Sequence, residues 1–202
     1  MNDRGVTLVE LVVVVSVIAI LAIAMGFSYV TWQGAYRAEK AVKDLSTDLM
    51  EARDTAMTQG RMCFADFNFP VPPPGRGTYR IACEDDTNAD AEGDIDENGQ
   101  IDAGAGHIFM QSINPKTIDF PITFSGGATI INFGKDGIIE RRDHPPAETI
   151  WTICLTTPQV AGVTVNSDYD CLRLSQTRIN MGKLTTQISD GGLCDADNCV
   201  AK

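Results

Sequence analysis

The sequence predicts an α+β fold, with a long N-terminal helix followed by an antiparallel β-sheet domain. Two observations support this prediction. Residues 6–27 form an almost wholly apolar run, and apolar residues then form a stripe with helical spacing as far as Ala56. After Gly60 the pattern changes to short apolar segments separated by turn-forming residues, which is typical of strands. We expect four parts: a leader (1–5), a long helix (6–59), a β-rich domain (60–189) and a C-terminal tail (190–202).

The first part of the predicted helix is apolar enough for a bilayer. Residues 6–27 read VTLVELVVVVSVIAILAIAMGF, and Glu10 is their only charged residue. A run of about 20 apolar residues matches the roughly 30 Å hydrocarbon core, so we predict a transmembrane segment at 6–27. A carboxylate there is costly and indicates a functional residue with a partner. Arg4 precedes the run, which favours a cytoplasmic N-terminus and a domain on the other side.

Three other interpretations of this run compete with a transmembrane segment of this kind. A secretory signal peptide could be cleaved near residues 22–24, but its basic region would hold only Arg4 against Asp3. A plain single-pass anchor explains the length and gives Glu10 and Gly5 no role. A buried globular helix is the weakest interpretation, because the run is too long and too evenly apolar.

The helix is expected to continue well beyond the apolar run. Its apolar positions recur at steps of three and four: Ala35, Ala38, Val42, Leu45, Leu49, Ala52 and Ala56. Gly60 is a suitable helix end. A helix over 6–59 would be roughly 80 Å long at about 1.5 Å per residue, so much of it must project from a domain of this size.

Three aromatic residues follow the apolar run, namely Tyr29, Trp32 and Tyr36. They suit either the headgroup layer of a membrane or packing on the domain. Gly26 and Gly34 are weak points in the helix interior, where the helix could bend or pack closely against another segment.

The remainder reads as strands and loops. We expect strand-like segments at 61–68, 77–83, 107–113, 118–124, 129–133, 138–141, 149–155, 171–175 and 176–181. A proline-rich loop separates the first two, and the acidic residues 85–106 read as another loop. Asp136-Gly137 between two apolar segments predicts a tight hairpin.

Six cysteines lie beyond the apolar run, on the side predicted to be outside the cytoplasm: Cys63, Cys83, Cys154, Cys171, Cys194 and Cys199. An even number in that position favours disulfides. Sequence alone does not fix the pairing, although sequence neighbours suggest Cys63–Cys83, Cys154–Cys171 and Cys194–Cys199. A zinc site is not expected, since there is no CxxC pair and the chain has two histidines.

The acidic loop contains a partial calcium-binding pattern. Its oxygen-bearing residues are Asp94, Asp96, Asn98 and Asp102. Their spacing resembles the start of an EF-hand loop, but Ala105 stands where that loop has its final Glu. A calcium site and a solvated acidic loop both remain open, and no other cofactor is expected.

Charge and motifs argue against two classes of function. The net charge is −11 and the isoelectric point is about 4.5, so the protein should repel phosphate, and nucleic acid is not an expected partner. No nucleophile motif or glycine-rich phosphate loop is present. We therefore expect no enzymatic activity and name no catalytic residue.

The N-terminus resembles that of type IV pilins and pseudopilins, on the strength of Gly5, Thr7, Leu8 and Glu10. Further similarity extends over about residues 1–188. It rests on the helix end at 51–57, the Asn132-Phe133 strand with its Asp136-Gly137 turn, and the closing segment 173–182. This order resembles the GspH/FimT group of pseudopilins, or minor pilins. Two departures are Val6, where the group more often has Phe, and Gly26, where many relatives have Pro.

The resemblance implies a structural subunit of a filament. A prepilin peptidase/methyltransferase would cut after Gly5 and methylate the amine of Val6. The chain would sit in the inner membrane with its domain in the periplasm, and would then join other pilins or pseudopilins in a type II secretion or type IV pilus filament. Glu10 would pair with the amine of a neighbouring subunit.

The alternative implied by the same resemblance is a DNA-binding minor pilin for DNA uptake. Its candidate residues are the cations near the C-terminus, Arg173, Arg178 and Lys183.

Overall fold

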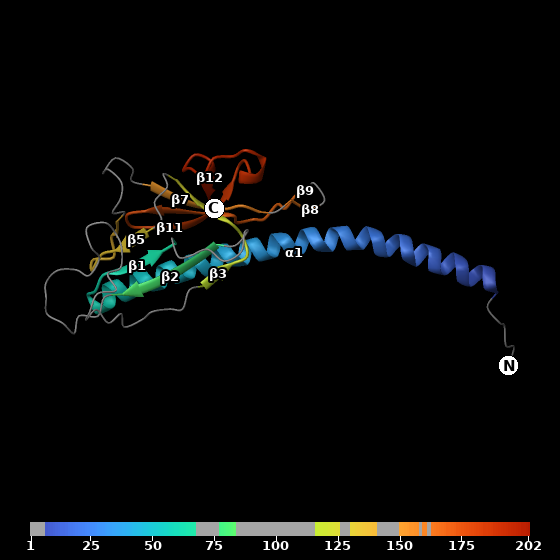
Figure 1. Cartoon of the computed structure of the whole chain (residues 1–202), viewed down its shortest axis with the longest axis horizontal. Coiled ribbons are helices and arrows are strands. Elements are labelled where there is room, and N and C mark those ends of the chain that lie inside the picture. The colour runs from blue at the N-terminus through green and yellow to red at the C-terminus, as the bar shows by residue number, and fades with distance from the viewer. Residues whose placement is uncertain are drawn as a thin grey trace.

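The computed structural model of the chain describes residues 7–67, 77–83, 116–125, 130–140, 150–157, 159–160 and 163–202. The predicted leader, the acidic loop and the predicted strand at 107–113 lie outside these residues. Within them, a long N-terminal helix precedes a series of antiparallel strands (Figure 1), which confirms the predicted α+β fold.

Helix α1 runs from Leu8 to Gln59. Thr7 caps its N-terminus, where the side-chain oxygen accepts a hydrogen bond from the Glu10 N–H at 3.3 Å. Gly60 ends it in the left-handed conformation, with φ of 63°, and its N–H donates to the Ala56 carbonyl. The prediction of one long helix ending at Gly60 is confirmed.

The two ends of α1 differ in their surroundings. Its C-terminal half packs on the β domain through the predicted stripe, and its N-terminal half projects away from the domain (Figure 1). Val42, Leu45 and Leu49 are fully buried. Ala35, the first position of the stripe, is half-buried at the edge of this contact.

The strands form two five-stranded antiparallel sheets and one short hairpin. The first sheet has the order β3-β2-β1-β5-β6, and the second has the order β12-β11-β10-β7-β4. The first contains β1 (Cys63–Asp66), β2 (Gly77–Cys83), β3 (Lys116–Ile118), β5 (Ile130–Phe133) and β6 (Ile139–Glu140). The second contains β4 (Ile122–Phe124), β7 (Ile150–Leu155), β10 (Cys171–Ser175), β11 (Ile179–Leu184) and β12 (Cys199–Ala201). The hairpin pairs β8 (Gln159–Val160) with β9 (Val163–Thr164).

Both sheets share one hydrophobic core with α1. Leu45 and Leu49 of the helix belong to the same buried cluster as Phe133 of the first sheet and Leu172 of the second. Because side chains alternate along a strand, the opposite faces of both sheets point away from the helix. The outer face of the second sheet carries residues 185–202, here called the C-terminal segment, which are seen in red on the side away from α1 in Figure 1.

Two strand predictions differ from the structure. The predicted strand 118–124 is divided, because the chain leaves the first sheet after Ile118 and enters the second at Ile122. Pro121 lies at this crossing, where it has no N–H to give to a ladder, and its carbonyl accepts from the Thr156 N–H. The predicted strand 176–181 is displaced to Ile179–Leu184, because residues 176–178 form the turn from β10 to β11.

Candidate functional site

The N-terminal half of α1 is a long apolar surface. Eleven large apolar side chains between Leu8 and Leu21 are each 50–80% exposed. Ser16 does not interrupt this surface with an unpaired hydroxyl, because its Oγ donates to the Val12 carbonyl at 2.8 Å. A large contiguous apolar patch marks an interaction site. This half of the helix is therefore the candidate site.

Glu10 lies in the first turn of α1, within this surface, and is itself exposed. A carboxylate at that position interacts favourably with the positive end of the helix dipole. The backbone N–H of Glu10 donates to the side chain of Thr7, the N-cap residue. This contact fixes the start of the helix three residues before Glu10. The predicted processing residues Gly5 and Val6 lie outside the described residues.

In the part of the chain that the structure describes, no helix combines the length and the apolar character needed to cross a membrane. The transmembrane segment at 6–27 remains a prediction.

Three aromatic rings follow the apolar surface along α1. Trp32 stacks on Tyr36 with ring centres 5.9 Å apart, and Tyr29 lies 6.3 Å from Trp32. All three side chains are 56–63% exposed, so packing on the domain does not account for them.

Gly34 is a close-packing site, because a Cβ there would lie 3.1 Å from the side chain of Val165.

A buried carboxylate fixes the other half of α1 to the first sheet. Asp48 accepts a hydrogen bond from the Tyr79 hydroxyl, and both of its oxygens lie 2.7 Å from Lys116 Nζ. Burial, and then the hydrogen bond to Asp48, raise the pKa of Tyr79. The cluster borders a groove of about 870 Å³ between α1 and β3. Because Asp48 is already engaged by two donors, we assign it a structural role.

Arg53 joins the helix to both sheets, a contact that sequence reasoning missed. Its Nε donates to the carbonyl of Gly137, and an Nη donates to the carbonyl of Thr177, each at 2.7 Å. These carbonyls belong to the β5–β6 turn and the β10–β11 turn. The β5–β6 turn is the predicted Asp136-Gly137 hairpin, in which Gly137 has a φ of 74°. The hairpin is confirmed, and no local pattern indicated its contact with Arg53.

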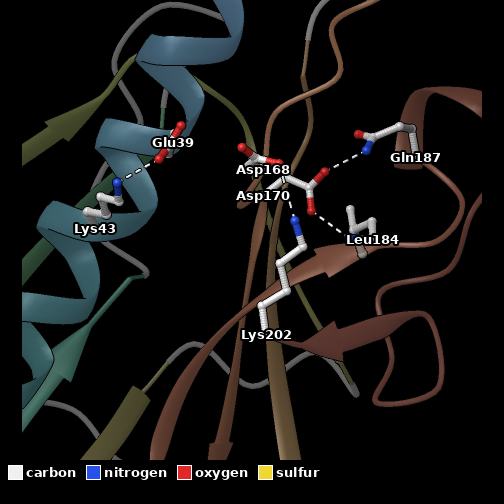
Figure 2. A network of polar contacts seen from close by, with 7 residues as sticks. All are labelled: Glu39, Lys43, Asp168, Asp170, Leu184, Gln187 and Lys202. Carbon is white, nitrogen blue, oxygen red and sulfur yellow. Dashed lines mark hydrogen bonds and ion pairs between the residues drawn. The ribbon is translucent and has the colours of Figure 1, made fainter.

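A second buried carboxylate, Asp170, holds the segment after β11 (Figure 2). Its two oxygens accept from the Leu184 N–H at 2.6 Å and from Gln187 Nε2 at 2.5 Å. Burial raises the pKa of Asp170, although both hydrogen bonds oppose that shift. Gln187 is oriented in turn by Thr157, whose hydroxyl donates to its Oε1 at 3.0 Å.

Tyr169 lies where α1 and the C-terminal segment meet. Lys43 Nζ and Lys202 Nζ are 5.6 and 5.7 Å from the centre of its ring. Each ammonium also has an acidic partner (Figure 2): Lys43 lies 2.6 Å from Glu39, and Lys202 lies 3.2 Å from Asp168. These exposed ion pairs contribute little stability one by one. Together they bring α1 and the C-terminus of the chain to one ring.

The cysteine pairing is only partly as the sequence suggested. Cys63–Cys83 is confirmed as a disulfide across β1 and β2. The other two suggested pairs are wrong, because the structure joins Cys154 to Cys194 and Cys171 to Cys199. Cys154 and Cys171 face each other across β7 and β10, and each bonds instead to the C-terminal segment, which lies on the same face of the sheet.

The cations proposed for DNA do not share a face. Arg173 follows Cys171 by two residues and points to the outer face of the second sheet. Lys183 follows Met181 by two residues and points to the helix side. Arg178 lies in the turn between the two strands. The three residues therefore do not form one basic patch.

The candidate calcium ligands Asp94, Asp96, Asn98 and Asp102 lie outside the described residues. Among the residues that the structure does describe, no group of three or more His, Cys, Asp or Glu side chains could hold a metal ion.

Residues 1–26 match the family described as the prokaryotic N-terminal methylation motif. No curated protein and no solved structure matches the chain. The match covers the apolar surface and Glu10, and it ends before the aromatic residues.

Proposed function

We propose that this chain is a structural, non-enzymatic subunit of a pilin-like filament, a minor pseudopilin or minor pilin. The observation that carries the proposal is the exposed apolar half of α1, which coincides with the methylation motif. Such a surface must be covered by lipid before assembly and by other subunits afterwards. In this proposal residues 6–27 anchor the subunit in the inner membrane, with the β domain in the periplasm.

Cleavage of the leader would create a positive charge that can pair with the carboxylate of Glu10. Cleavage after Gly5 by a prepilin peptidase leaves an amine on Val6, and methylation keeps that amine cationic. Glu10 lies about one helical turn further on. In a bundle of helices, its carboxylate meets the amine of a neighbouring subunit in an apolar environment, where a broken pair is strongly unfavourable. The pair would fix the register between subunits.

Two machines could use such a subunit, a type II secretion system or a type IV pilus. Copurified partners would distinguish them. The DNA-uptake alternative has less support, because Arg173 and Lys183 point to opposite faces and the net charge is −11. Binding of the protein to DNA at low salt would restore it.

The test is the intact mass of the protein purified from its native membrane. We expect a chain that begins at Val6 and carries one additional methyl group. A Gly5→Val variant should keep the leader, because a side chain before the cut obstructs the peptidase. A native chain that begins at Met1, or beyond Ala24, would refute the proposal.

A further inference from the structure

Four cysteines form one cluster on the outer face of the second sheet. Cys154, Cys171, Cys194 and Cys199 pack together there with Leu184 and Ile188. We propose that this cluster is a thiol–disulfide exchange site with two alternative pairings. The observed pairing fastens residues 185–202, the C-terminal segment, to the sheet. The alternative pairing, Cys154–Cys171 with Cys194–Cys199, removes both covalent links and leaves the segment held by its non-covalent contacts alone. The reactant is a thiol, either a small molecule or the cysteine of a thiol–disulfide oxidoreductase.

The strand register already brings Cys154 and Cys171 together. They are direct partners across β7 and β10. The next residue, Leu155, donates its N–H to the Asp170 carbonyl at 2.9 Å, which places the two cysteines at a non-hydrogen-bonded position of the ladder. Side chains approach most closely at such positions, where the Cα atoms are about 4.5 Å apart. Cys63 and Cys83 are also direct register partners, 4.0 Å apart at Cα, and they are bonded.

A turn holds Cys194 close to Cys199. Asp195 Oδ1 accepts the N–H groups of Asp197 and Asn198 at 3.1 and 2.7 Å. The Asp195 carbonyl accepts the N–H of Cys199 at 3.1 Å. Each of these contacts is local to the turn, so they do not depend on the bonds to the sheet. The alternative pairing can therefore form with the hydrogen bonds of the turn in place.

One sulfur of the four offers an entry point. Cys154, Cys171 and Cys199 are fully buried, whereas Cys194 is half-buried. Its Sγ lies at the edge of the cluster, 3.3 Å from the carbonyl oxygen of Thr123 in β4. An external thiolate reaches Cys194 first, and access is one of the factors that decide which sulfur is attacked.

The exchange balances without net oxidation or reduction. An external thiolate attacks Cys194 Sγ, which forms a mixed disulfide and frees the Cys154 thiolate. Cys154 attacks Cys171 Sγ, forming the cross-strand bond and freeing the Cys199 thiolate. Cys199 then attacks Cys194 Sγ in the mixed disulfide, closes the small ring and returns the external thiolate. Two disulfides are present before and after.

The exchange would change the edge of the second sheet. With the observed disulfides, β12 pairs with the edge of β11, and Cys199 lies opposite Leu184 and Ala201 opposite Gly182. Gly182 leaves room for this arrangement, because a Cβ there would lie 2.8 Å from Cys199 Sγ and 2.7 Å from the Val200 carbonyl oxygen. Once the two disulfides no longer link the segment to the sheet, β12 can separate from β11, which then offers a free edge to another strand.

The test maps the disulfides of the full-length protein during incubation with reduced and oxidised glutathione. Alkylation stops the exchange, and a protease that cuts before aspartate separates Cys154 from Cys171 at Asp168 and Cys194 from Cys199 at Asp197. Mass spectrometry should show Cys154–Cys171 forming at a rate that rises with glutathione concentration. The Cys63–Cys83 bond serves as the internal control and should persist. If no Cys154–Cys171 bond forms, whether the four cysteines become reduced or keep the observed pairing, the proposal is wrong.

A double variant tests the geometry without the C-terminal bonds. In Cys194→Ser/Cys199→Ser, the remaining two thiols should oxidise to each other under the same glutathione conditions. A cooperative unfolding transition in denaturant shows that the domain of the variant is folded. If the variant is folded and Cys154 and Cys171 remain alkylatable thiols, the proposal is refuted. If the variant does not fold, the mapping of the wild-type protein decides.

Discussion

The two halves of α1 share one backbone and have opposite environments. From Leu8 to Leu21, large apolar side chains are exposed, whereas Val42, Leu45 and Leu49 are fully buried against two sheets. One acid from each half shows the same contrast: Glu10 is exposed, whereas Asp48 is engaged by Tyr79 and Lys116. Apolar composition alone therefore does not locate the core. The spacing of the apolar residues locates it, because a run that is apolar at every position has no preferred face, whereas a stripe marks one face of the helix.

Removing a core side chain should give the largest effect. We expect Leu49→Ala to lower the free energy of unfolding by about 2–5 kcal/mol, because it leaves a cavity where the helix meets both sheets. Val14→Ala, in the exposed half, should change it by less than about 0.5 kcal/mol. Chemical denaturation of both variants in detergent measures the difference. Equal losses would mean that the exposed half also packs on the domain.

Neutralising Glu10 and Asp48 in turn sharpens the same contrast. We expect Asp48→Asn to cost about 1–3 kcal/mol, since Lys116 loses its ion pair and the Tyr79 hydroxyl keeps a weaker acceptor. Glu10→Gln should leave the unfolding free energy of the monomer unchanged and impair incorporation into filaments. Denaturation and a filament-pelleting assay separate the two effects. A stability loss in Glu10→Gln, with normal pelleting, would contradict the assignment.

Arg53 tests whether the buried half also holds the turns. Arg53→Ala should cost about 1–2 kcal/mol, because the carbonyls of Gly137 and Thr177 lose a charged donor. Hydrogen exchange should rise in both turns at once. Arg37→Ala, one exposed arginine earlier on the helix, is the matched control and should leave both turns unchanged. A rise in only one turn would show that the bridge is not shared.

The smallest effect concerns pH and arises in the domain. Burial raises the folded-state pKa of Asp170 above its ordinary value of 3.8, so the folded protein binds more protons than the unfolded chain between the two values. Its contribution to stability therefore falls as pH rises through that window. Asp170→Asn should remove this decline, which unfolding curves at several pH values would show. An unchanged difference between variant and wild type from about pH 4 upward would refute the shift.

The sequence predicted the parts of this fold that depend on local patterns. The helix stripe, Gly60, the bounds of β2 and the Asp136-Gly137 hairpin follow from spacing and turn chemistry. In the candidate site, the apolar run and the position of Glu10 within it are likewise local features of the sequence.

Other features depend on which strands become neighbours. The pairing of Cys171 with Cys199 requires β12 to lie beside β11, and nothing within either segment indicates that order. The contacts of Arg53 likewise join turns far apart in the chain. The division at Pro121 could have been anticipated, because a proline inside a predicted strand argues against a continuous one.

The absence of a side chain at Gly182 limits how this domain can vary. A methyl group there would meet both the sulfur of Cys199 and the backbone of Val200. A chain with alanine or a larger residue at that position would have to abandon either the Cys171–Cys199 bridge or the last strand of the sheet. Glycine at 182 and cysteine at 199 should therefore be gained or lost together as such domains diverge.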